Sequence, residues 1–195
     1  MVKKVNILDK TAIDLEQQLI ARCIKGERAA QFELYTKYAR RMLNVAHRIV
    51  RHEEDARDVL QEAFLKAFSN LKTYRHQASF QAWLKRIVIN TAINQAKKKG
   101  LTIVDKPELL DRAHAEQRSE QRAQIKASVK QAHQALMQLP DGYRTILSLY
   151  LLEGYDHQEI AEILNISVST SLSQYSRGKK KWLALIKKMN EYGQD

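Results

Sequence analysis

The chain has 195 residues, of which 44% are hydrophobic and 28% are charged, so it is long enough for one or two small globular cores. Only six glycines and two prolines interrupt it, which favours helices over a turn-rich β fold. The formal net charge of +11 indicates a polyanionic partner, and the single cysteine, Cys23, excludes an intramolecular disulfide.

The sequence carries no signal for secretion or for membrane insertion. Its first residues lack the apolar core of a signal peptide, and no run approaches the ~18 apolar residues of a membrane span. A lone cysteine is typical of the reducing cytoplasm. We therefore expect a cytoplasmic protein without membrane insertion, and nucleic acid is the favoured polyanion.

Positive charge is concentrated in the first half of the chain. Residues 1–100 carry a net charge of +10, whereas residues 138–195 carry none. No acidic residue occurs between Glu62 and Asp105, although eight basic residues do. An acid-free stretch of this length is the electrostatic pattern expected of a nucleic-acid-binding segment.

Three helices are predicted before residue 70. Apolar residues recur at helical spacing from Asp14 to Arg51, and Gly26 divides that run into two helices. The third helix is predicted to begin near Glu53, and three of its acidic residues share one face with Gln61 at the edge. These residues are Asp55, Asp58 and Glu62. The helix dipole explains Asp55 in the first turn, but the later acids indicate a second partner that is not nucleic acid.

A polar loop from Tyr74 to Ser79 is predicted to lead into a fourth helix, which begins near Phe80. Apolar residues recur there at i, i+3, i+4, i+7 and i+8, which assigns Trp83 mainly to the core. The opposite face carries basic and amide side chains that suit phosphate contacts and base-edge hydrogen bonds. They are Arg86, Asn90 and Asn94, followed by Lys97 and Lys98. The simpler alternative is an ordinary solvated face.

Residues 101–124 are predicted to form a polar linker, because they contain too few apolar residues to bury a face of their own. The chain after it is predicted to form short helices, with joints at Pro140–Gly142 and at Gly154. Asp156 with Glu159 makes a capping-box pattern at the start of one helix. A short turn then leads to a second helix with Ser167 as its N-cap, which is a helix-turn-helix spacing.

In this order the motifs resemble those of the small, two-domain, extracytoplasmic-function (ECF) type of RNA polymerase sigma factor in the sigma-70 family. The segment DARDVLQEAFLKAF resembles the family's docking motif, and FQAWLKRIVINTAIN resembles its promoter-reading helix. The segment from Gln138 to Trp182 resembles its C-terminal helix-turn-helix. The resemblance implies an all-α fold with two small helical domains joined by a polar linker, the second being a helix-turn-helix domain (winged-helix-like, without a wing). The implied division is region 2 over residues 1–100, a linker over 101–124 and region 4 over 125–195.

The resemblance also implies the partners and the residues that meet them. The chain would bind core RNA polymerase through Asp55, Asp58, Gln61 and Glu62. The loop before the fourth helix would hold a flipped base of the non-template strand at the −10 element, and the helix would contact the same strand. The −10 residues would be Tyr74, Arg75, Ser79, Phe80, Lys85, Arg86, Asn90, Asn94 and Lys97. Duplex DNA at the −35 element would be read by Ser169, Thr170, Leu172, Ser173, Ser176, Arg177, Lys179 and Lys180.

One position departs from the family pattern. Members commonly have a basic residue where this chain has Leu172, and a hydrophobic residue where it has Ser171. Leucine cannot donate a hydrogen bond to guanine, so it would either contact a thymine methyl group or pack away from the DNA. The −35 sequence therefore does not follow from the resemblance. Family members also often act under an anti-sigma factor, a partner that the sequence neither requires nor excludes.

Two other functions compete with promoter recognition as explanations of this sequence. A helix-turn-helix regulator that does not bind core polymerase would explain the C-terminal half, but not the acid-free stretch or the acidic face. A nucleic-acid enzyme would need a catalytic or metal-binding constellation. We find none, because His52, Glu53 and Glu54 are adjacent in sequence and would point in different directions on a helix. The expected protein is not an enzyme and needs no cofactor or metal.

Overall fold

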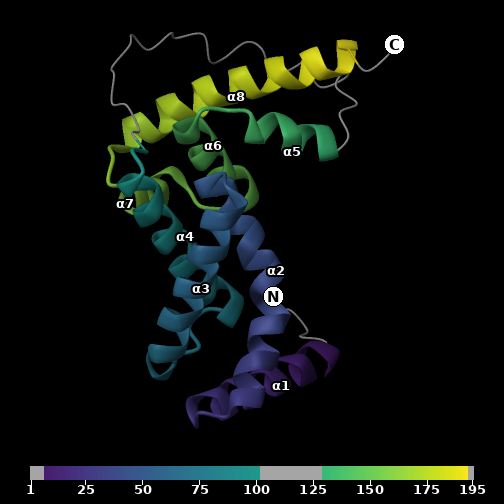
Figure 1. The fold of residues 1–195 in the computed structure, drawn as a ribbon, viewed down its shortest axis with the longest axis vertical. Helices are drawn as coiled ribbons and strands as arrows, with labels where there is room; N and C mark the ends of the chain where they lie inside the picture. Colours follow the sequence, from purple (N-terminus) through teal and green to yellow (C-terminus); the bar gives the residue numbers. More distant parts are fainter. Residues whose placement is uncertain (1–6, 102–128, 193–195) are drawn as a thin grey trace, which may run out of the picture. The chain divides into compact units, whose positions relative to one another are not determined.

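The computed structural model describes residues 7–101 and 129–192 of the chain. Within those ranges the regular structure is entirely helical, which confirms the predicted all-α fold (Figure 1). Before the linker, the elements are α1 (Ile7–Ile24), α2 (Arg28–Val50), α3 (Glu53–Ser69), η1 (Leu71–Thr73) and α4 (Phe80–Lys98). After it, they are α5 (Val129–Met137), α6 (Asp141–Leu147), η3 (Ser148–Leu152), α7 (His157–Leu164) and α8 (Val168–Tyr192).

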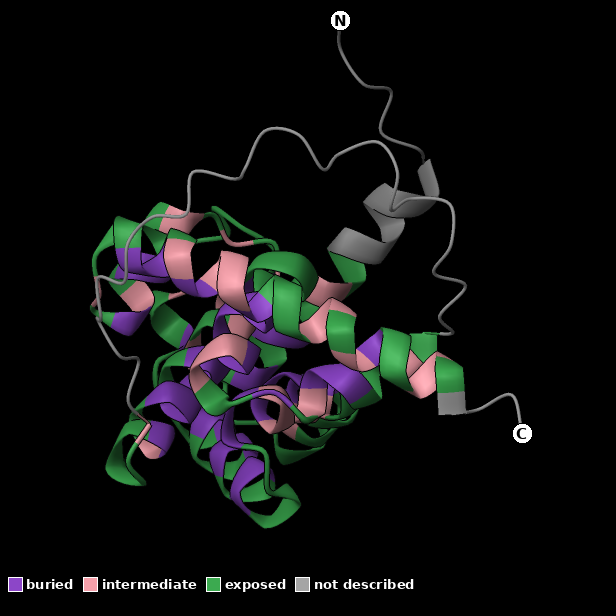
Figure 2. Ribbon diagram, turned by 90° about the horizontal axis from the view of Figure 1, so that it is seen from above, coloured by how far each residue is buried: buried purple, intermediate pink, exposed green. Residues whose placement is uncertain are grey.

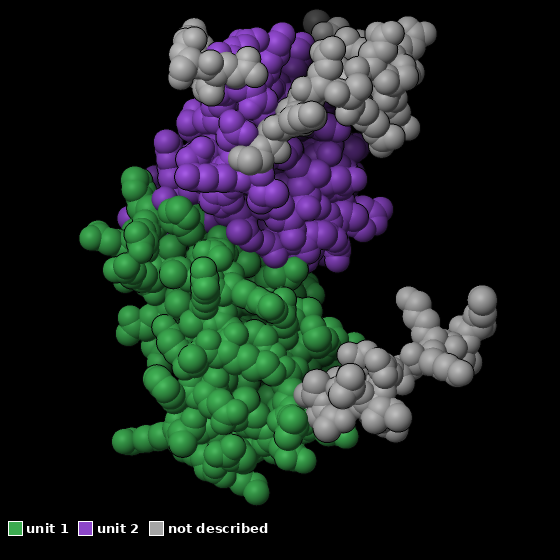
Figure 3. All heavy atoms as spheres, turned by 90° about the vertical axis from the view of Figure 1, so that its right-hand side faces the viewer, with its two compact units in different colours: residues 1–47, 52–92 green, residues 48–51, 93–195 purple. Residues whose placement is uncertain are grey.

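The chain divides into two compact units (Figure 3). The first comprises residues 1–47 and 52–92, and the second comprises residues 48–51 and 93–195. The predicted linker over residues 101–124 lies, apart from Leu101, outside the described residues. Each unit has buried apolar residues of its own, as expected for two small domains.

The core of the first unit follows from the apolar periodicity of its helices (Figure 2). α3 buries one stripe of residues, and its Phe64 ring contacts Tyr35 of α2, while Tyr38 of α2 contacts Phe80 of α4. The contributing residues include Leu34, Tyr38, Met42, Val59, Leu60, Phe64, Phe80, Leu84 and Val88. Gly26, with φ of +85°, occupies the left-handed conformation that turns the chain from α1 into α2. Helix breaks and helix faces in this unit therefore lie where the sequence predicts them.

The helix-turn-helix of the second unit is built from two capped helices. Asp156 accepts hydrogen bonds from the backbone N–H groups of Gln158 and Glu159, while the Glu159 carboxylate accepts one from the Asp156 N–H. This is the predicted capping box, which satisfies backbone donors at the start of α7. Asn165 ends α7 in the left-handed conformation, and the Ser167 hydroxyl accepts from the Thr170 N–H at 3.1 Å as the N-cap of α8.

Helix α8 is held from behind by α5 and α6 as well as by α7. Gly178 is buried where α8 meets α6, and a Cβ placed on it would lie 3.1 Å from the Tyr143 Cβ. The Trp182 indole N–H donates to the Ala132 carbonyl at 2.9 Å, which ties α8 to α5. Leu136, Leu139 and Leu147 form the buried cluster between these helices. These contacts with α5, α6 and α7 determine which face of α8 is directed outward.

Candidate nucleic-acid and polymerase interfaces

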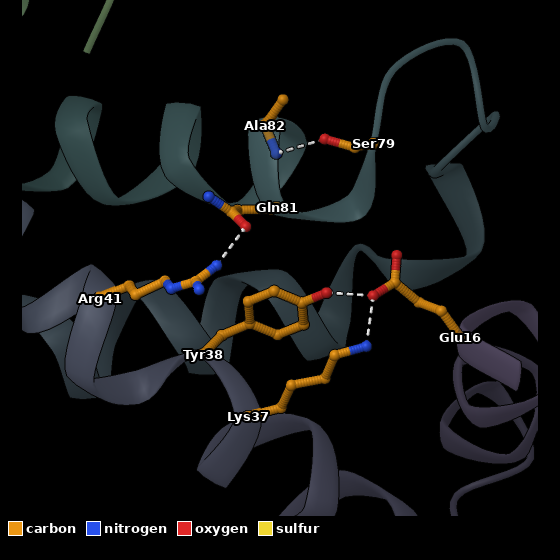
Figure 4. A network of polar contacts seen from close by, with 7 residues as sticks. All are labelled: Glu16, Lys37, Tyr38, Arg41, Ser79, Gln81 and Ala82. Carbon is orange, nitrogen blue, oxygen red and sulfur yellow. Dashed lines mark hydrogen bonds and ion pairs between the residues drawn. The ribbon is translucent and has the colours of Figure 1, made fainter. Parts of the chain in front are cut away.

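Two side-chain hydrogen bonds order the loop between η1 and α4: one spans the loop and the other caps the helix that follows it. The Tyr74 hydroxyl donates to the Ala78 carbonyl at 2.7 Å, within the loop. The Ser79 hydroxyl accepts from the Ala82 N–H at 3.2 Å and caps the first turn of α4 (Figure 4). The predicted polar loop is therefore an ordered turn with a defined aromatic residue at its start.

Aromatic rings pack beneath and beside this loop. The Tyr74 ring centroid lies 4.4 Å from that of His76, 5.6 Å from that of Phe80 and 5.4 Å from that of Trp83. Phe80 is only 1% exposed, whereas Tyr74 and Trp83 are half-buried. Trp83, which the sequence assigned mainly to the core, is thus shared between the core and the loop. Burial raises the pKa of the Tyr74 phenol, so it remains a protonated donor.

The predicted −10 residues differ in how far their side chains are exposed to solvent. Phe80 lies beneath the loop as a support, and Tyr74 and Lys85 are half-buried. The remaining ones are exposed, and they are Arg75, Ser79, Arg86, Asn90, Asn94 and Lys97. Arg86, Asn90 and Asn94 recur at intervals of four residues and so form one face of α4, opposite buried Leu84 and Val88. Basic and amide groups of this kind can contact phosphates and base edges.

The predicted polymerase-docking face lies on α3. Asp58, Gln61 and Glu62 are exposed, whereas Asp55 is 7% exposed. Glu62 is paired with Lys66 at 2.6 Å, and this exposed ion pair contributes little to stability. The accessible members of this predicted face are therefore Asp58, Gln61 and Glu62, with Asp55 buried at the start of the helix.

The outward face of α8 carries most of the predicted −35 residues. Ser169, Leu172, Lys179 and Lys180 are exposed, and Ser173, Ser176 and Arg177 are half-buried. Leu172 is 49% exposed, so it does not pack into the core of the unit. Thr170 differs, because it is 3% exposed and its hydroxyl lies 2.7 Å from that of Ser167. The structure therefore groups the other predicted residues on one surface and places Thr170 behind it.

A polar and aromatic cluster behind α8 is absent from the sequence-based prediction. His157 Nδ1 lies 2.9 Å from the hydroxyl of Ser171, which is fully buried. The His157 ring stacks on Tyr150 with centroids 4.6 Å apart and meets Tyr175 edge-on at 5.3 Å. Burial lowers the pKa of His157, which favours the neutral ring. The only signal in the sequence was Ser171, a polar residue where the family resemblance implies a hydrophobic one.

The described residues hold no group of three or more side chains suited to a metal ion. None of the helices in residues 7–101 and 129–192 is long and apolar enough to cross a membrane. The described surfaces comprise an aromatic loop, an amide and basic helix face, an acidic face and a serine-rich helix.

Comparison with known proteins assigns both halves of the chain to known domain families. The family model for Sigma-70 region 2 matches residues 34–102, and that for Sigma-70, region 4 matches residues 130–181. The chain is 33% identical over 174 residues to the RNA polymerase sigma-H factor of Pseudomonas aeruginosa, covering 85% of this chain and 90% of that protein. It is 26% identical over 174 residues to the ECF RNA polymerase sigma-E factor of Haemophilus influenzae, covering 85% and 92%.

The fold is also similar to a solved structure, that of the sigma factor RpoE in complex with the anti-sigma factor NepR from Bartonella quintana. The TM-score is 0.52 at 20% sequence identity, and the match covers 80% of this chain and 95% of that one. At this identity the likeness concerns the fold. The relative at 33% identity and the two family models, which match most of the described residues, lead to one conclusion: the chain belongs to the sigma-70 family of RNA polymerase sigma factors, in its ECF group.

Proposed function

We propose that the chain directs promoter-specific initiation by core RNA polymerase through three surfaces, each contributed by one of the helices α3, α4 and α8. α3 docks on the polymerase, α4 and its preceding loop bind the −10 element, and α8 reads the −35 element. The observation that carries the proposal is the exposed Arg86–Asn90–Asn94 face beside an ordered aromatic loop, within a stretch that contains no acidic residue. The chain contributes recognition, and the polymerase carries out the chemistry.

At the −10 element, the loop holds a base that has left the duplex. Flipping a base costs a few kcal/mol of unstacking and unpairing. A stacked aromatic contact is worth about 1–3 kcal/mol per base, and Tyr74 and His76 present rings at the loop surface. Arg86, Asn90 and Asn94 add contacts to the same strand along α4. These contributions together offset the cost of opening, so the loop favours the melted promoter.

At the −35 element, α8 lies in the major groove with its serine face toward the bases. Ser169, Ser173 and Ser176 are short donors and acceptors that allow close approach, and Lys179 and Lys180 contact phosphates. Leu172 lies on this face and offers an apolar contact to a thymine methyl group. Thr170 supports the turn rather than the DNA.

On the polymerase side, Asp58, Gln61 and Glu62 form the docking face. Because the partner and the genome are in the cytoplasm, we place the protein there as well. RpoE of Bartonella quintana is known in complex with the anti-sigma factor NepR. By analogy, we propose that an anti-sigma factor also binds and restrains this chain. Affinity purification under reconstitution conditions would identify that partner.

Transcription by core polymerase reconstituted with the purified full chain tests the proposal. We expect transcripts whose 5′ ends, once sequenced, share −10 and −35 sequences upstream. The matched control is Asp58→Lys, which should reduce the transcripts without altering the helical circular dichroism spectrum. Absence of any specific transcript, together with failure to bind core polymerase, would instead favour a helix-turn-helix regulator that acts alone.

A further inference from the structure

Helix α1 precedes the part of the chain that the region 2 family model matches, which begins at residue 34. A partly buried polar contact ties it to α2. The Tyr38 hydroxyl donates to Glu16 Oε1, and Lys37 Nζ lies 2.6 Å from the same oxygen (Figure 4). Leu19 and Ile20 of α1 are buried nearby in sequence, so α1 is part of the folded unit. None of the surfaces described above uses this contact.

The protonation states of the two groups favour the contact. Burial raises the pKa of the Glu16 carboxyl, but the hydrogen bonds from Lys37 and Tyr38 outweigh it and lower the pKa below its usual value. Burial and the bond to Glu16 raise the pKa of the Tyr38 phenol. A carboxylate therefore accepts from a phenol O–H, and hydrogen bonds to charged groups are the stronger class.

The contact reaches the −10 loop through a chain of rings. The Tyr38 ring centroid lies 5.3 Å from that of Phe80, and Phe80 lies 5.6 Å from both Tyr74 and Trp83. Tyr38 is 4% exposed and Phe80 1%, so neither ring can rotate without disturbing its neighbours. α1 also contacts η1 directly, just before the loop. Two routes therefore lead from α1 to the loop.

We propose that Glu16 is a positioning residue for the −10 loop: it fixes the Tyr38 ring, which supports Phe80 and thereby holds Tyr74 in place for single-stranded DNA. This inference rests on the function proposed for the loop. It gives α1 an indirect part in promoter opening, because the proposal requires no contact between α1 and the DNA that the loop binds. The alternative is that the contact only anchors α1.

Four variants separate positioning from anchoring. Glu16→Ala removes the acceptor for both partners, and Glu16→Gln restores a neutral acceptor for the Tyr38 hydroxyl. Tyr38→Phe removes the hydroxyl but keeps the ring. Lys37→Met removes the ion pair and the contact of the ammonium group with the Tyr38 ring, but leaves the Tyr38–Glu16 hydrogen bond in place. Glu27→Ala is the matched control, because it breaks an exposed 2.8 Å ion pair with Arg22 near the other end of α1.

The first measurement needs no DNA. Hydrogen exchange of the full chain would follow the amides of Thr73 and Tyr74, which donate to Asn70 and Leu71 at 2.9 and 3.2 Å. We expect about tenfold faster exchange in Glu16→Ala and Tyr38→Phe, and little change in Lys37→Met and Glu27→Ala. The double variant Glu16→Ala/Tyr38→Phe should add nothing to either single change, because both remove one interaction. Equal exchange in wild type and Glu16→Ala would overturn the proposal.

The second measurement uses the non-template −10 strand of a promoter mapped with the reconstituted polymerase. Affinity for that oligonucleotide should fall about three- to tenfold in Glu16→Ala and recover in Glu16→Gln, while affinity for the −35 duplex stays the same. An equal loss at both DNA sites would indicate a general effect on folding and contradict positioning. Tyr74→Ala tests the loop itself: if it does not weaken binding of the single strand, the loop's proposed function fails independently of Glu16.

Discussion

Replacing Leu172 by arginine should change which −35 sequence the protein prefers. Leu172 is 49% exposed on the outward face of α8, between Ser169 and Ser176. Half of its side chain is already in water, so the substitution removes about 1 kcal/mol of burial at most. Leucine and arginine have similar helix propensities. The fold should therefore tolerate the change, and any effect on DNA binding can be attributed to the contact surface.

The expected gain in discrimination follows from the geometry of guanine recognition. An arginine that bonds both O6 and N7 of guanine is worth about 1–3 kcal/mol against the wrong base, which corresponds to about 5- to 150-fold in affinity. The wild-type leucine can prefer only a thymine methyl group at this position. Leu172→Arg should therefore convert a weak or thymine-directed preference into a guanine preference at one base pair.

Selection from a randomised −35 duplex library by wild-type and variant protein would measure this effect. Ala184→Arg is the matched control, because it adds the same charge to an exposed position further along α8. Both variants should strengthen binding at low salt, but only Leu172→Arg should change the selected sequence. An unchanged −35 preference would show that residue 172 does not reach the bases and would refute the assigned orientation of the helix.

Four further changes test the other surfaces and the fold. Asp58→Lys should weaken binding to core polymerase at least tenfold at unchanged melting temperature, and equal affinity in a competition assay would contradict the docking role. Arg177→Ala should lower the salt slope of duplex binding by about 0.9 if the residue contacts a phosphate, and an identical slope would remove it from the interface. Gly178→Val should destabilise the second unit by about 2–3 kcal/mol in urea unfolding, because its side chain would overlap α6, whereas Lys180→Val on the exposed side should not. The depressed pKa of His157 means that the unfolded chain binds the proton more tightly, so stability should fall as pH drops below 6.5, and His157→Phe should flatten that dependence.

The helices of the first unit could be predicted because local signals agree with tertiary packing. Gly26 marks the break before α2, and the acidic first turn marks the start of α3 at Glu53. The helix predicted from Phe80 begins at that residue. Each of these signals involves residues within one or two helical turns of one another, and such local signals can be read directly from a single sequence. The faces of α3 and α4 follow from the same periodicity.

The remaining features depend on contacts between distant residues. Glu16 and Tyr38 are 22 positions apart, and nothing in the local pattern of either pairs them. The π-helical turn η3 also has no marker in its sequence, SLYLL. Gly178 was a visible signal, since a glycine within a helical pattern usually has a packing reason. Its partner on α6 is 35 residues earlier, so only the structure identifies the reason.

The serine-rich helix shows why periodicity could not separate its exposed residues from its buried ones. Positions 169 to 171 are all small and polar, so the sequence gives no apolar contrast with which to orient them. The structure buries Thr170 and Ser171 and satisfies their hydroxyls through Ser167 and His157. A buried hydroxyl without a partner costs about 1–3 kcal/mol, so rotating α8 by one residue would lose both contacts.

Two hydrogen bonds therefore act together with the packing of α8 on α5, α6 and α7 to orient the start of this helix. Hydrogen bonds depend on direction, whereas apolar packing tolerates small rotations, so the pairs with Ser167 and His157 define the register more narrowly. That register directs Ser169, Leu172, Ser173 and Ser176 outward. Ser171 and Leu172 are consequently related, because the buried His157–Ser171 contact contributes to the helix orientation that exposes Leu172.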